Sequence, residues 1–149
     1  MKKGFTLIEL LAVIVILAII ALIATPIIMR IIESSKQSAA ERSAERYASA
    51  VETMIASKRM EGIVVEDGLY SINSEGNLVK DGEIYEVEMS GNYPKSGTIA
   101  IENSQVVESV SAGKTEMKIG NYDVEYNNDR FVVLGSNNTG GIPSTPEDN

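Results

Sequence analysis

Glu9 is a carboxylate whose position needs a chemical explanation. It stands directly before fifteen unbroken apolar residues, Leu10 to Ala24. An acidic side chain inside a membrane-spanning helix costs on the order of 2.5–3.5 kcal/mol on insertion scales, so such residues usually have a function. We therefore expect Glu9 to require a cationic partner.

The cationic partner that the sequence offers is an α-amino group. Cleavage after Gly4 would expose this amine on Phe5, one helical turn from Glu9 or on a neighbouring subunit. In the alternative, Glu9 has no partner and its side chain reaches the headgroup zone of a membrane, because it lies only one turn inside the apolar segment.

The residues around Gly4 are typical of a processing site. Gly4 ends the short basic segment at residues 1–4, and a glycine there leaves the backbone open to a protease. An ordinary secretory signal would end in Ala-x-Ala after the apolar stretch, and that pattern is absent between Leu10 and Arg30. We expect cleavage to remove residues 1–4 and to leave the apolar segment in place.

The element that positions these residues is a membrane-spanning helix over residues 5–32. About 20 apolar residues cross the hydrocarbon core at roughly 1.5 Å per residue, and this segment is long enough to do so. Lys2 and Lys3 precede it, so we expect the N-terminus in the cytoplasm and the rest of the chain outside.

Residues 3–10 read Lys-Gly-Phe-Thr-Leu-Ile-Glu-Leu. This stretch resembles the leader junction of type IV prepilins and of the pseudopilins of type II secretion and competence systems, and the resemblance covers residues 1 to about 60. It implies that a prepilin peptidase cuts after Gly4, that Phe5 is N-methylated, and that Glu9 pairs with the terminal amine of an adjacent subunit during assembly. Pro26 matches the family's helix-breaking proline, which implies a kink, whereas Ala18 stands near the place where many pilins have a glycine.

The resemblance also implies partners and a location. The partners are further copies of the chain in a helical homopolymer, the prepilin peptidase and the pilus assembly machinery. Before assembly the chain would cross the inner (cytoplasmic) membrane once, and afterwards it would belong to a cell-surface filament. No cofactor and no metal ion are expected.

A single helix is predicted from the start of the apolar segment to Gly62. No glycine occurs between Phe5 and Glu61, and the only proline in that range is Pro26. Residues 33–61 are amphipathic and continue into the soluble part. Apolar side chains at steps of three and four predict the face that packs there: Ala40, Ala44, Tyr47, Val51, Met54 and Ile55.

Residues 62–134 predict a small antiparallel β-sheet head, which gives an α+β fold, as the resemblance also implies. Alternating apolar residues favour strands at 83–89, 98–102, 115–119, 122–126 and 130–134. A hairpin turn is expected at 127–129, and the Asp-Gly steps at 67–68 and 81–82 are expected to be turns. Residues 135–149 are rich in Gly, Asn, Ser, Thr and Pro and are expected to be a flexible tail.

Composition excludes several kinds of chemistry. The sequence has no Cys and no His, so it has no thiol nucleophile, no imidazole base and none of the usual zinc ligands. Residues 62–149 carry five basic and fifteen acidic side chains, and a net charge of −10 disfavours binding to nucleic acid. Carboxylates cluster at Glu83, Glu86 and Glu88, where a solvated strand edge is a simpler explanation than calcium binding or acid/base catalysis.

Four functions compete on these observations. A structural pilin is favoured, and a pseudopilin of a secretion or competence pseudopilus shares the same anchor. A tip adhesin would need a larger head than the roughly 88 residues after Gly62 provide. A membrane-tethered enzyme would need a catalytic constellation that the sequence does not show, so we expect the protein not to be an enzyme.

Overall fold

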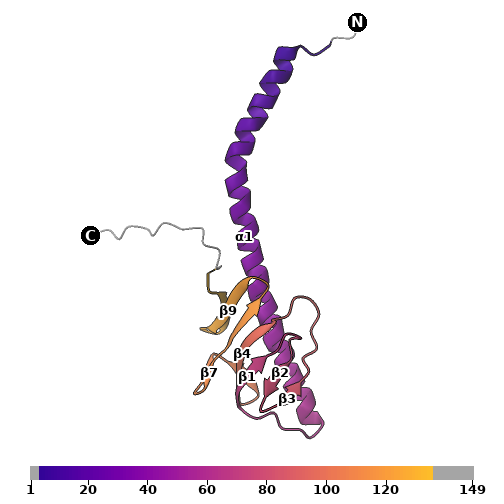
Figure 1. Ribbon diagram of the computed structural model, residues 1–149, viewed down its shortest axis with the longest axis vertical. Coiled ribbons are helices and arrows are strands. Elements are labelled where there is room, and N and C mark those ends of the chain that lie inside the picture. Colours follow the sequence, from indigo (N-terminus) through magenta and orange to yellow (C-terminus); the bar gives the residue numbers. More distant parts are fainter. Residues whose placement is uncertain (1–3, 136–149) are drawn as a thin grey trace, which may run out of the picture. The chain divides into compact units, whose positions relative to one another are not determined.

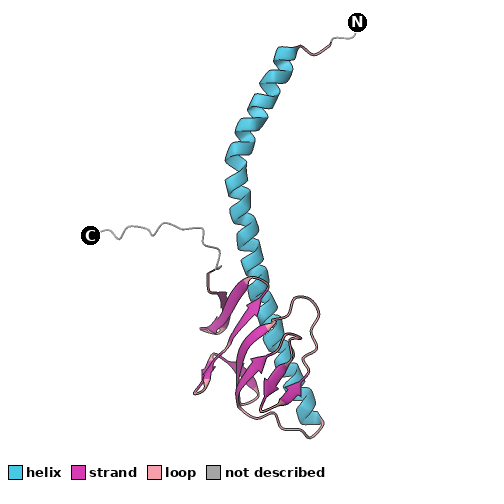
Figure 2. Cartoon of the chain, in the orientation of Figure 1, coloured by secondary structure: helices cyan, strands magenta, loops and turns pink. Residues whose placement is uncertain are grey.

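A computed structural model describes residues 4–135 of the 149-residue chain. The chain divides into two compact units, the first ending at Ser38 and the second beginning at Ala39. One helix and ten short strands make up the described part, coloured by type in Figure 2. The predicted flexible tail at 135–149 lies outside the described residues, apart from Gly135.

Helix α1 runs from Leu7 to Met60 without interruption, close to the bounds predicted from the sequence. Its C-terminal end is a Schellman motif, in which the N–H of Ile63 donates to the carbonyl of Lys58 at 2.9 Å and the N–H of Gly62 to that of Arg59 at 3.0 Å. Gly62 adopts φ +83°, a conformation that glycine reaches without steric cost. The predicted stop at Gly62 therefore has a specific geometric cause.

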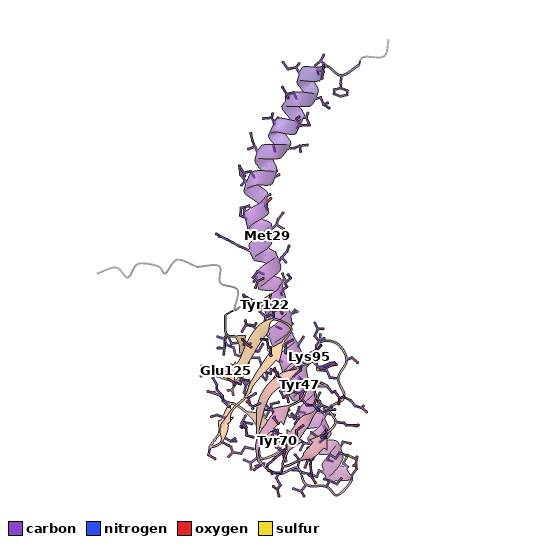
Figure 3. All side chains as sticks on the ribbon, in the orientation of Figure 1. Met29, Tyr47, Tyr70, Lys95, Tyr122 and Glu125 are labelled. Carbon is purple, nitrogen blue, oxygen red and sulfur yellow. The ribbon has the colours of Figure 1, made fainter. Side chains whose placement is uncertain are left out.

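In the first unit, the helix presents apolar side chains on every side. All nineteen large apolar residues between Phe5 and Ile32 are exposed, from 43% to 90%. Figure 3 shows these side chains projecting outward all around the helix, with Met29 among them. A helix that is apolar all round is stable only when lipid or protein covers it.

The second unit contains an antiparallel sheet packed on the C-terminal part of α1, as expected (Figure 1). The strand order is β10-β9-β8-β4-β1-β2-β3, and β5 pairs with the far end of β4. Strands β6 and β7 form a separate two-stranded ribbon. The strand bounds are β1 Gly68–Ile72, β2 Leu78–Lys80, β3 Glu83–Tyr85, β4 Ser96–Glu102, β5 Gln105–Val107, β6 Ser109–Val110, β7 Gly113–Lys114, β8 Glu116–Ile119, β9 Tyr122–Asn127 and β10 Arg130–Val133.

Two-residue turns connect five pairs of neighbouring strands. In the β9–β10 hairpin, Asn127 pairs with Arg130, and Asn128 and Asp129 have φ +50° and +60°. Two positive φ angles define a type I′ turn, whose twist matches that of the strands. The turn predicted at 127–129 is thus confirmed, with Asn127 itself belonging to β9. The β2–β3 turn, at the predicted Asp81-Gly82 step, is built in the same way.

The core lies between α1 and the sheet. Tyr47 is completely buried on the helix, and its hydroxyl donates to the carbonyl of Gly76 at 2.9 Å (Figure 3). Every helical residue predicted for the packing face is buried. The sheet contributes mainly Tyr70, Ile72, Leu78, Ile99, Ile101, Met117, Ile119, Val124 and Phe131.

The predicted strand over residues 83–89 is too long. The β2–β3 ladder ends at Tyr85, and residues 86–89 are irregular. The alternation of that segment was nevertheless real, because Tyr85, Val87 and Met89 all pack against the core while the glutamates between them are exposed. Alternating burial therefore continues where strand hydrogen bonding stops, because the partner strand β2 begins at Leu78, opposite Tyr85, and leaves residues 86–89 without a strand to pair with.

Several side chains of the second unit bond to sheet backbone, among them Thr115 and two glutamates. Thr115 fills the seam where the partner of β4 changes from β8 to β5: its Oγ1 accepts from Ala100 N at 2.8 Å and donates to Val107 O at 2.6 Å. The two glutamates belong to α1. Glu41 Oε1 accepts from Val133 N at 3.2 Å, and Glu52 Oε1 accepts from Val106 N at 3.1 Å.

Candidate processing and assembly site

The predicted cleavage point lies just before the helix. Gly4, Phe5 and Thr6 are non-helical and exposed, and α1 begins at Leu7. Phe5 is 90% exposed, and no heavy atom lies within 4 Å of the position that a Cβ on Gly4 would take. Among residues 4–135, nothing therefore covers the Gly4–Phe5 peptide bond, as a protease substrate requires.

Glu9 closes the N-terminus of α1 together with Thr6. The Glu9 Oε2 accepts hydrogen bonds from the backbone N–H and from the hydroxyl of Thr6, both at 2.9 Å. In return the Thr6 Oγ1 accepts from the Glu9 N–H at 3.3 Å. This reciprocal arrangement is a capping box, with Thr6 at the N-cap and Glu9 at the third helical position.

The role of Thr6 was not predicted from the sequence. The signal was present, since Thr-x-x-Glu before an apolar run is the usual pattern of a capping box. Because the Gly4–Phe5 bond is intact in this chain, Phe5 has an amide nitrogen and not an amine. Both Glu9 hydrogen bonds use Oε2, and residues 4–135 provide no cation for this carboxylate.

Pro26 lies inside α1, and the helix continues through it. A proline has no N–H to donate to the carbonyl four residues earlier, here that of Leu22. The adjacent Thr25 hydroxyl donates to the carbonyl of Ala21 at 2.6 Å. This part of the helix is therefore held by fewer backbone hydrogen bonds than its neighbours. The kink itself remains a prediction.

The second unit offers little for catalysis. Within residues 4–135, no group of three or more Asp or Glu side chains is arranged to hold a metal ion. The carboxylates Glu86 and Glu88 are exposed, and they line a shallow groove beside α1 rather than an enclosed cavity.

Comparison with known proteins identifies the prokaryotic N-terminal methylation motif over residues 1–25. No curated protein and no solved structure matches the chain. By length and composition, α1 contains one stretch apolar enough to cross a membrane. The chain thus combines the methylation motif with a pilin-like α+β fold, a combination typical of type IV pilins and pseudopilins, which are generally structural proteins without enzymatic activity.

Proposed function

We propose that this protein is the structural subunit of a bacterial type IV pilus. The observation that carries the proposal is the joint presence of the methylation motif and a helix whose apolar surface is entirely uncovered in one chain. Lipid would cover this surface before assembly, and the helices of neighbouring subunits would cover it in the filament.

Processing would prepare the chain for polymerisation. Hydrolysis of the Gly4–Phe5 bond leaves a carboxylate on Gly4 and a new amine on Phe5, which is then N-methylated. The Glu9 carboxylate, which pairs with no cation among residues 4–135, would pair with the amine of an adjacent Phe5. In an apolar filament core an unpaired carboxylate is costly. Any stagger between neighbouring subunits that separates Glu9 from the Phe5 amine would therefore be disfavoured.

Intact mass measurement and N-terminal sequencing test the proposal. Both are applied to protein sheared from the cell surface and to the membrane fraction of the same cells. We expect the sheared protein to begin at Phe5, with a mass that includes one added methyl group.

The other outcomes separate the alternatives. Mature Phe5 found only in the membrane would favour a pseudopilin of a short pseudopilus. If the protein keeps residues 1–4 in both the sheared and the membrane fraction, the proposal is overturned. The apolar helix would then serve only as a membrane anchor.

A further inference from the structure

A groove of about 580 Å³ lies beside the C-terminal part of α1 in the second unit. Met54 and small residues of the helix form one side, and Ile84 forms part of the other. Ile84 is 62% exposed and belongs to β3, the edge strand of the sheet. An exposed isoleucine on a sheet edge is a contact surface left uncovered in the single chain.

The rim of this groove has an unbalanced charge. Lys58 is its single cation, and it already pairs with Glu61 at 3.0 Å. Glu75, Glu86 and Glu88 also line the groove and are exposed. None of these three forms an ion pair within residues 4–135. The groove therefore fits a partner that brings long aliphatic side chains ending in positive charge, which is the character of arginine.

Helix α1 presents such side chains on another surface. Arg42 and Arg46 are exposed and lie four residues apart, so they project from one face of the helix. The buried residues Ala40, Ala44 and Tyr47 turn a different face toward the sheet. Neither arginine pairs with a carboxylate within the described residues.

We infer that the groove binds the Arg42–Arg46 face of α1 from a second copy of this chain. The inference rests on the proposed polymerisation and specifies one contact between subunits. The guanidinium groups reach Glu75, Glu86 and Glu88, and their methylene stems cover Ile84. The contact is head-to-tail because the proposed helical polymer requires it, so each bound subunit leaves a groove free for the next.

Charge exchange in the full-length protein tests this contact. The variants are Arg42→Glu with Arg46→Glu, Glu86→Arg with Glu88→Arg, and the combination of all four changes. Each pair of reversals places like charges together, so we expect at least about a tenfold loss of processed protein from the sheared surface fraction. The combination restores opposite charges, and we expect it to recover most of the assembly.

The matched control reverses two exposed carboxylates outside the groove that form no ion pair among the described residues, Glu102→Arg with Glu108→Arg. Its assembly should stay within about twofold of the wild type, because exposed charges away from a contact have little effect. The inference is overturned if this control loses assembly as strongly as the groove variant. It is also overturned if the variant with all four charge reversals does not recover assembly.

Crosslinking provides a second measurement that does not depend on a folding defect. The wild-type sequence has no cysteine, so Arg46→Cys and Glu88→Cys introduce unique thiols. When the two single variants are co-expressed, a short bismaleimide should give dimers, whereas each variant alone should not. Absence of dimers from the co-expressed filaments would contradict the contact.

The two levels of inference fail in distinguishable ways. Wild-type protein that is never found in sheared filaments refutes the proposed function. Wild-type filaments that form normally, with groove variants that assemble equally well, refute only the groove contact.

Discussion

At the scale of single residues, Glu9 combines two roles that can be separated by mutation. Its carboxylate closes the helix N-terminus with Thr6, and its charge is proposed to pair with a neighbouring Phe5 amine. Glutamine at this position retains a capping box but has no charge. The two roles therefore make different predictions for Glu9→Gln.

Glu9→Ala should be cleaved after Gly4 and inserted in the membrane but should be lost from filaments. The expected decrease is at least about tenfold, since removing one partner of a buried ion pair costs several kcal/mol. Glu9→Gln should show the same loss. The amount of mature protein in the sheared and membrane fractions measures both effects. Normal assembly of Glu9→Gln would show that the charge of Glu9 is not needed for assembly.

Thr115 is predicted to be a critical polar residue of the core. Thr115→Val keeps the shape of the side chain but leaves Ala100 N–H and Val107 C=O without their partner. Each unsatisfied buried group costs about 1–3 kcal/mol, so we expect the free energy of unfolding to fall by roughly 2–4 kcal/mol. Thermal unfolding of the full-length protein in detergent measures this fall.

The control for this prediction is Thr98→Val. The Thr98 hydroxyl donates to Lys114 O at 2.8 Å, but at a more exposed position where water can replace the bond. We expect a cost below about 1 kcal/mol. If the two substitutions lower the free energy of unfolding equally, the Thr115 hydrogen bonds between β5 and β8 contribute no more to stability than an exposed side-chain hydrogen bond.

Residue types predicted the candidate site in part. Gly4, Phe5 and Glu9 stood out because a glycine, a new amine and a carboxylate beside an apolar run suggest a specific chemistry. Thr6 did not stand out although Thr-x-x-Glu before an apolar run is a capping-box pattern, because a threonine is common everywhere and it is the helix start at Leu7 that identifies Thr6 as the N-cap. Whether Glu9 meets a neighbouring amine depends on a second chain, which a single sequence does not describe.

At the scale of elements, the sequence predicted long and regular features better than short ones. The helix was predictable because its stop at Gly62 is a local feature. Strands β1, β2 and β5 were not identified individually, because three to five residues contain too little alternation. For β1 a distant partner adds to this, since it pairs with β4 from Gly68↔Ile101 onward, whereas β2 and β5 pair with strands next to them in the sequence.

Gly97 in β4 is predicted to be irreplaceable within the sheet. An alanine Cβ at this position would overlap the carbonyl oxygen of Glu116 and approach Met117 Cα to 2.6 Å. Its φ of +135° is also unfavourable for any residue with a side chain. We expect Gly97→Ala to prevent cooperative thermal unfolding of the head or to lower its midpoint by more than about 10 °C.

Gly91→Ala separates the two causes. Gly91 has φ +100°, but no heavy atom lies within 4 Å of the added Cβ. It should therefore show only the backbone cost, about 1–3 kcal/mol. A Gly97→Ala protein no less stable than Gly91→Ala would contradict the close approach of β4 and β8.

At the scale of the whole molecule, stability should be lost at alkaline pH. Burial raises the pKa of Tyr47 above its usual value, and burial with nearby carboxylates raises the pKa of Tyr70 to about 12. The folded state therefore holds these phenolic protons more tightly than the unfolded state, in which the pKa is about 10. Their stabilising contribution is complete below pH 10 and decreases above it, and the contribution of Tyr70 is lost as the pH rises through 12.

Thermal unfolding of the full-length protein between pH 6 and 12 tests this dependence. With no His in the chain, we expect a nearly constant midpoint from about pH 6 to 9 and a steep fall above 10. Tyr70→Phe should make the fall less steep. If the unfolding midpoint of Tyr70→Phe falls as steeply with pH as that of the wild type, other groups cause the loss of stability at alkaline pH.

The bonds from Glu41 and Glu52 to the sheet have a mechanical consequence. In the proposed filament, tension would act along the helices, and each head would have to follow its own helix. The carboxylates of Glu41 and Glu52 accept hydrogen bonds from β10 and β5, respectively. The two residues are eleven positions apart, which is about 16 Å along α1 at 1.5 Å per residue. Tension on the helix is thereby shared between two separated attachments and the core between them. In single-molecule pulling, Glu41→Ala with Glu52→Ala should detach the sheet from the helix at a lower force than the wild type.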